Sequence, residues 1–353
     1  MYPNLTINLE KIQDNTEKVT AVCREKGIDV TAVTKCAGGN PDVARAFLEG
    51  GAAALGDSRI KNLQDLSEIP VEKWLIRIPM ISEAEEAVKY ADLSLNSELA
   101  VLQELNREAI RQKKKHDVIL MADHGDLREG WFDENDFYQD LKEIRRLSGL
   151  NVRGLGTNSN CAGAVIPEPG SFTKLKKMYD VMQDLFGENC NMFSGGNSGA
   201  FYMVEDGTLP PFINNLRFGE LLLFGNETSF EKKYPWLHSD VFRLDAEIVE
   251  LKEKPSEPIG KHGKDAFGNE PVFEDIGIRK RALCALGKQD VTVEDIFPLE
   301  PGTKIVTASS DHLIVDVTDC PEPLKVGDIL SFSCNYVSAL RASTSDYVNK
   351  TTI

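Results

Sequence analysis

The chain has 353 residues, of which 41% are hydrophobic and 27% are charged, a globular composition that excludes a disordered or collagen-like chain. Its 40 Lys and Arg against 56 Asp and Glu give a net charge of −16, which argues against partners such as nucleic acid or an anionic membrane surface. No apolar run is long enough to span a membrane, no signal peptide is visible, and the seven cysteines lack metal-ligand spacing. We therefore expect a cytoplasmic protein with reduced thiols and no metal.

The first two-thirds of the chain alternates apolar runs with helical patterns. A predicted helix at 5–25 is followed by eight apolar runs, at 30–34, 52–55, 74–78, 93–95, 118–121, 152–155, 192–193 and 216–218. Helical patterns separate these runs, beginning at 41 (with glycines at 50 and 51 after its end), and then at 59–67, 82–90, 97–113, 134–148, 171–187 and 199–206. Eight strand–helix units predict a closed (β/α)8 barrel. An open doubly wound sheet is the alternative, but no GxGxxG turn follows the first strand.

The pattern changes near residues 234–236. Beyond this point apolar residues alternate with polar ones, as in 241–249, 305–306, 313–315 and 329–332, and Pro/Gly-rich turns separate the runs. Such a pattern predicts an all-β domain without a long helix. The fold class is therefore α/β, with a TIM-like barrel domain at 1–235 and a C-terminal β domain at 236–353.

Active groups of a (β/α)8 barrel sit at the C-terminal ends of its strands, so the polar residues beyond each run are the candidates. They are Lys35, Asp57, Ser58, Arg77, Asn96, Ser97, Asp123, His124, Arg128, Thr157, Asn158, Ser159, Ser194, Asn197, Ser198 and Arg217. Lys35 directly follows the first strand. It is either a solvated rim residue or a desolvated amine with a lowered pKa, able to form an imine with an aldehyde such as pyridoxal phosphate.

Two further strand ends could hold a phosphate. The glycine-rich segment 194–199 follows the seventh strand and opens a helix, so that its backbone N–H groups and the Ser198 hydroxyl are candidate anion ligands. Arg217 ends the eighth strand and is a candidate ligand for a phosphate or a pyridine nitrogen. The alternatives are an empty flexible turn and an ion pair of Arg217 with Glu220. Arg128 is a candidate clamp for a substrate carboxylate, or an exposed loop residue.

Taken together, these residues resemble the alanine racemase-type, fold-type III pyridoxal-phosphate enzymes. The stretch from Val33 to Gly39 resembles the segment with the cofactor lysine, and 216–225 resembles the family's RxG…YG segment. The resemblance implies pyridoxal 5′-phosphate bound covalently to Lys35, Arg217 beside the pyridine nitrogen, and Arg128 near the substrate. It also implies that Asn158 lies near the cofactor ring, that the phosphate is held by Asn197, Ser198, Gly219 and Tyr347, and that Glu220 is a further contact of the cofactor.

The chain also departs from the family pattern. Met121 replaces a lysine found two residues before the family's Asp, and Asn158 replaces a histidine. The tyrosine that serves as second base, supplied by the partner subunit's β domain, has no clean counterpart. In the matching stretch, 255–268, His262 and Asp265 are the candidates, each with a turn residue as its alternative. Ser310 and Asp311 fall in a segment that resembles the substrate loop.

The stretches 255–268 and 308–319 are most similar to the ornithine racemase branch of the family. We therefore expect an isomerase that interconverts L- and D-ornithine in a head-to-tail homodimer, by removing the Cα proton on one face with Lys35 and replacing it on the other. An acidic group should then bind the second amine of ornithine, and Glu220, Asp265 and Asp311 are candidates. Other possibilities are an alanine or other amino-acid racemase, a decarboxylase, a D-amino-acid lyase, a non-catalytic pyridoxal-phosphate-binding protein, and a plain binding protein.

Overall fold

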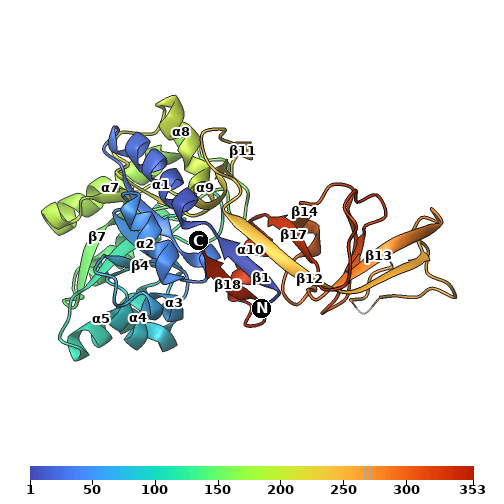
Figure 1. Ribbon diagram of the computed structural model, residues 1–353. Helices are drawn as coiled ribbons and strands as arrows, with labels where there is room; N and C mark the ends of the chain where they lie inside the picture. Colours follow the sequence, from blue (N-terminus) through green and yellow to red (C-terminus); the bar gives the residue numbers. More distant parts are fainter. Residues whose placement is uncertain (266, 271) are drawn as a thin grey trace. The chain divides into compact units, whose positions relative to one another are not determined.

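The computed structural model describes residues 1–265, 267–270 and 272–353. These residues form two compact units, a barrel unit of Leu9–Ser239 and a β unit made of Met1–Asn8 and Asp240–Ile353. Each unit buries its own set of apolar side chains. In Figure 1 the barrel unit runs from blue to yellow, and the β unit combines the first blue strand with orange and red segments.

The barrel unit contains a closed barrel of eight parallel strands, as the sequence predicts. The last strand pairs with the first, with Thr31 opposite Arg217, so the sheet has no free edge. The strands in order around the barrel are β2 (Asp29–Val33), β3 (Ala54–Asp57), β4 (Lys73–Leu75), β5 (Leu93–Asn96), β6 (His116–Met121), β7 (Leu150–Gly156), β8 (Met192–Ser194) and β9 (Asn215–Phe218).

Helices connect these strands and begin where the capping residues lie. Asn40 caps α2 by accepting a hydrogen bond from the backbone N–H of Asp42 (2.8 Å), and Asp133 caps α6 in the same way. Buried side chains of β3 to β6, among them Trp74 and Ile119, form a core cluster. The helices of this unit are α1 (Leu9–Arg24), α2 (Pro41–Glu49), α3 (Ile60–Asp65), α4 (Ala84–Tyr90), α5 (Leu99–Arg111), α6 (Glu134–Ile144), α7 (Phe172–Phe186), α8 (Phe201–Asp206) and α9 (Glu220–Phe224).

The β unit is built on one long strand, β12 (Phe242–Pro255), which pairs with β13, β17 and β1. Along β12 the buried residues Leu244, Ala246 and Ile248 alternate with more exposed ones, and this gives the period of two seen in the sequence. The remaining strands are β13 (Ile278–Cys284), β14 (Ile296–Pro298), β15 (Lys304–Ala308), β16 (Leu313–Asp316), β17 (Ile329–Cys334) and β18 (Asn349–Thr352). A separate two-stranded sheet, β10 (Asn226–Glu227) and β11 (Lys232–Lys233), belongs to the barrel unit.

Two expectations from the sequence need correction. Residues 4–7 form strand β1 (Asn4–Ile7) rather than the start of a helix, because Leu5 pairs with Leu244 on one side and Lys350 on the other. Residues 1–8 therefore belong to the β unit, whereas the sequence places them with the barrel. The β unit also contains a helix, α10 (Tyr336–Thr344), which Asn335 caps. Within the described ranges, no helix combines the length and apolarity that crossing a membrane requires.

Candidate active site

Lys35 lies at the C-terminal end of β2, where it opens a short 3-10 helix (Lys35–Ala37). The side chain is half-buried, and the residue before it is anchored: Thr34 donates its hydroxyl to the Asp57 carboxylate at the end of β3 (2.7 Å). Asp57 also accepts hydrogen bonds from Asn62 Nδ2 (3.0 Å) and from the backbone N–H of Arg59 (2.9 Å). Two neighbouring strand ends thus fix the turn that carries the lysine.

Arg217, on β9, is buried, with 4% of its surface exposed. Its guanidinium donates to the Ser194 hydroxyl (2.5 Å) and to the Thr157 carbonyl (2.8 Å), so it joins the ends of β7, β8 and β9. Burial lowers the pKa of this guanidinium to about 10, which leaves it protonated at neutral pH. The oxygens that accept its hydrogen bonds are neutral, and Glu129 and Arg128 act on its charge in opposite directions, so a ligand with negative charge would be stabilised here.

The glycine-rich segment after β8 forms a turn that opens a 3-10 helix (Ser198–Ala200). Gly196 adopts φ +132°, a conformation that side chains disfavour. Asn197 caps the 3-10 helix by accepting from Gly199 N–H (2.9 Å), and its Nδ2 donates to Asn158 Oδ1 (3.1 Å). The Ser198 hydroxyl accepts a hydrogen bond from Leu221 N–H (3.1 Å), which links this turn to the start of α9.

Glu220 is the first residue of α9 and follows Gly219. Burial raises the pKa of its carboxyl, while a hydrogen bond from Asn226 Nδ2 (3.0 Å) and the ammonium of Lys35 act in the opposite direction. The residue is therefore near enough to Lys35 for the ammonium charge to act on it, while Arg217 donates its hydrogen bonds to Ser194 and Thr157. Lys35, Gly219 and Glu220 meet where the first and last strands of the barrel end.

The loop after β6 carries Arg128. Asp123 accepts backbone hydrogen bonds from Gly125 (2.7 Å) and Leu127 (3.2 Å) inside the loop. Asp126, buried to 2% exposure, accepts from backbone N–H groups of residues 161, 162 and 165, and so fastens this loop to the one after β7. The Arg128 guanidinium pairs with both carboxylate oxygens of Glu129.

The remaining predicted site residues belong to the β unit. His262 is exposed, and its Nε2 lies 3.0 Å from the Pro258 carbonyl. Asp265 caps a turn: backbone N–H groups of Asn269 (2.8 Å) and Phe267 (2.9 Å) donate to its carboxylate, and these bonds lower its pKa. Ser310 and Asp311 lie in an exposed turn and hydrogen-bond to each other (3.0 Å), and Tyr347 is 72% exposed.

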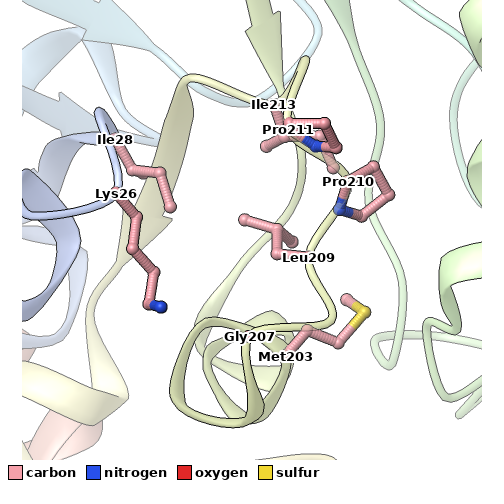
Figure 2. Close-up of a pocket in the computed structure, with 8 residues that line it drawn as sticks. All are labelled: Lys26, Ile28, Met203, Gly207, Leu209, Pro210, Pro211 and Ile213. Carbon is pink, nitrogen blue, oxygen red and sulfur yellow. The ribbon is translucent and has the colours of Figure 1, made fainter.

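A pocket of about 190 Å³ lies at the other end of the barrel, where the strands begin. Figure 2 shows Ile28, which precedes β2, and Ile213, which precedes β9, among the residues that line it. The pocket is distinct from the cluster formed by Lys35, Arg217 and Asn197, which lies at the strands' C-terminal ends.

The structure thus brings predicted residues from four strand ends into one cluster: Arg128, Asn158, Asn197 and Arg217, with Lys35 and Glu220 at the barrel's closing seam. Glu129 was not among the residues predicted from the sequence; its carboxylate pairs with Arg128, and its Oε1 lies 3.5 Å from Asn158 Nδ2. Its position directly after a candidate clamp arginine was a usable signal.

Barrel, site cluster and β unit together define a fold-type III enzyme, and comparisons with known proteins give its family. Residues 7–227 match the family model described as "Alanine racemase, N-terminal domain". An ornithine racemase of Acetoanaerobium sticklandii is 43% identical over 350 residues, 99% of both chains. A lysine racemase of Thermotoga maritima is 39% identical over 353 residues, 99% of this chain and 98% of the other. The chain therefore belongs to the alanine racemase family and is an amino-acid racemase, an isomerase.

Solved structures agree with this fold. An alanine racemase of Clostridium difficile 630 superimposes with a TM-score of 0.77 at 18% identity, covering 100% of this chain and 96% of the other. An alanine racemase of Bartonella henselae with covalently bound pyridoxal phosphate gives 0.70 at 15% identity and covers 99% of each chain. At these identities the likeness establishes the shared architecture.

Proposed function

We propose that this racemase interconverts L- and D-ornithine with pyridoxal 5′-phosphate as its cofactor. The observation that carries the substrate is the 43% identity to an ornithine racemase along 99% of both chains. The similarity to a lysine racemase favours the same class, amino acids with a second amine. Alanine is a further candidate after ornithine and lysine, since alanine racemases share the fold.

The described residues fit the cofactor. Arg217 is a buried cation with neutral hydrogen-bond acceptors, and an anionic ring and phosphate would compensate its charge. Asn197, Ser198, Gly219 and Tyr347 are the proposed contacts of the phosphate, Glu220 is a proposed contact of the cofactor, and Asn158 would lie beside the ring. Bound to the substrate's amine, pyridoxal phosphate would spread the charge that develops when the Cα proton leaves.

The protein's own groups would then hold and move the proton. The amine of the half-buried Lys35, whose turn is anchored by the Thr34–Asp57 contact, is the proposed acceptor and donor on one face of Cα. Arg128 would bind the α-carboxylate, since a guanidinium fork matches two carboxylate oxygens. Arg217, which remains protonated at neutral pH, would disfavour a proton on the ring nitrogen and so limit side reactions.

The second base is proposed to come from the β domain of a partner subunit in a head-to-tail homodimer. His262 is the better suited candidate, because its imidazole is exposed and such a ring has one nitrogen that can accept a proton and one that can donate it. Asp265 already accepts backbone hydrogen bonds that stabilise its charged form, which makes it a weak proton carrier. Ser310 and Asp311 are proposed contacts of the substrate.

These proposals are tested together by deuterium wash-in. In deuterated water, substitution of the second base should suppress exchange from one enantiomer of ornithine more than from the other. We expect this asymmetry for His262→Gln, and equal suppression from both enantiomers would assign the residue a structural role. An active monomer in analytical sedimentation would contradict the shared site.

The substrate itself is tested by the loss of optical rotation from a panel of pure L- and D-amino acids. We expect ornithine to have the highest kcat/KM, followed by lysine, with alanine and serine far slower. A higher kcat/KM for alanine would replace the ornithine assignment.

The seven cysteines are all free thiols, which supports a cytoplasmic location.

A further inference from the structure

The guanidinium proposed to bind the substrate carboxylate is already engaged. Nε and Nη2 of Arg128 donate to the two oxygens of Glu129, and Nη1 contacts Cys161 Sγ. The geometry is the two-pronged one by which arginine binds any carboxylate. An amino acid that uses this face of Arg128 must therefore displace Glu129.

Glu129 lies inside the site cluster rather than on its outer surface. Only 13% of its side chain is exposed, against 34% for Arg128. Its Oε1 lies 3.5 Å from Asn158 Nδ2, and its charge acts on the buried Arg217, whose pKa it raises against the larger effect of burial. Once separated from Arg128, this carboxylate would be left poorly solvated and without its cation, which is unfavourable.

We propose that Glu129 is the residue that selects a substrate with a second amine. The substrate's α-carboxylate takes Arg128 from Glu129, and its distal ammonium pairs with the released Glu129 carboxylate. A substrate with a neutral side chain supplies no such cation, so its binding would leave the Glu129 carboxylate without a partner. This inference rests on the proposed function and names the group that recognises the side chain of the substrate.

Other acids around the strand ends are engaged in ways that the substrate need not disturb. Asp123 and Asp126 accept backbone N–H groups that hold their loops. Asp57 holds the lysine turn, and Glu220 accepts from Asn226. Among these described carboxylates, Glu129 is the one whose pairing competes directly with carboxylate binding at Arg128.

The test compares ornithine with norvaline, which has the same carbon chain without the terminal amine. We expect Glu129→Gln to lower kcat/KM for ornithine by roughly 30-fold, as for removal of one partner of a desolvated charge pair. The same variant should leave kcat/KM for norvaline unchanged or raise it. Glu129→Asp, which keeps the charge, should retain the preference for ornithine. The matched control is Glu143→Gln, which removes an exposed Glu–Arg pair at the C-terminal end of α6 and should change kcat/KM for neither amino acid.

A second readout does not depend on turnover. Saturating ornithine should raise the melting temperature of the wild-type protein more than norvaline does, and Glu129→Gln should abolish that difference. Equal losses of kcat/KM or of thermal stabilisation for both amino acids, or no loss for either, would overturn the proposal. Equal losses would show that Glu129 only orients Arg128. Failure of the proposed function itself would be seen earlier, as a wild-type protein that does not racemise ornithine.

Discussion

The Thr34 hydroxyl donates a 2.7 Å hydrogen bond to Asp57, and both residues are fully buried. This contact joins the residue before Lys35 to the neighbouring strand. Burial raises the pKa of the Asp57 carboxyl, although hydrogen bonds from Thr34, Arg59 and Asn62 oppose that effect. The position of Lys35 therefore depends on a carboxylate that does not itself have to touch a substrate.

Removing the Thr34 hydroxyl should weaken both the fold and the reaction. Thr34→Val leaves Asp57 buried with one donor fewer, which costs about 1–3 kcal/mol in the free energy of unfolding. We also expect a lower kcat, because the lysine turn loses an anchor. Thr34→Ser, which keeps the hydroxyl, is the control and should recover most of both quantities. Urea unfolding and initial rates measure them, and equal behaviour of the Val and Ser variants would contradict the anchoring role.

Arg217 should support cofactor binding in a way that lysine cannot replace. Arg217→Lys cannot reach both Ser194 and Thr157 with a planar fork, so we expect stability to fall by about 2 kcal/mol and pyridoxal-phosphate affinity to fall at least about tenfold. Arg153→Lys changes a half-exposed arginine at the other end of the barrel and serves as the control. Fluorescence titration with the cofactor makes the comparison. Unchanged affinity in the Arg217 variant would remove this residue from the cofactor site.

His116 should make the fold sensitive to mild acid. It is 1% exposed, its Nε2 lies 2.8 Å from Ser94 Oγ, and burial lowers its pKa to about 4. The unfolded chain, with an imidazole pKa near 6.5, binds the proton more readily than the folded protein does, so this contribution to stability is complete above pH 6.5 and is lost as the pH falls toward 4.

From pH 6.5 to 5 the loss attributable to His116 amounts to about 2 kcal/mol. Urea unfolding at pH 7.5 and 5 should therefore show a smaller difference for His116→Gln than for the wild type. His312→Gln, at an imidazole that is 47% exposed, should keep the wild-type difference. An unchanged pH dependence in the His116 variant would exclude this group as its source.

The barrel could be predicted because parallel strands covered on both faces appear as short continuous apolar runs, such as Val30–Val33. The C-terminal ends of those runs then pointed to Lys35, Asn197 and Arg217. Strand β1 was missed because it has only two apolar residues, Leu5 and Ile7, and its strand partners lie more than 200 residues away, at Leu244 and Lys350. Helix α10 was missed because a nine-residue segment among strands gives a weak periodic signal.

The contacts within the site were less accessible to sequence reasoning. Asp57 was visible as a residue after a strand, but its bond to Thr34 depends on the register between β2 and β3. Glu129 directly follows a candidate clamp arginine in the sequence, but the pairing of its carboxylate with the Arg128 guanidinium is seen only in the folded loop. Glu220 was expected either to bind cofactor or to pair with Arg217, and the structure instead hydrogen-bonds it to Asn226.

The most direct test is reduction of the protein with borohydride after incubation with pyridoxal phosphate, followed by peptide mapping. We predict a visible absorbance band that disappears on reduction, with the cofactor fixed to Lys35, and neither band nor label in Lys35→Ala. Absence of the band from the wild-type protein, or a label on a different lysine, would contradict the account.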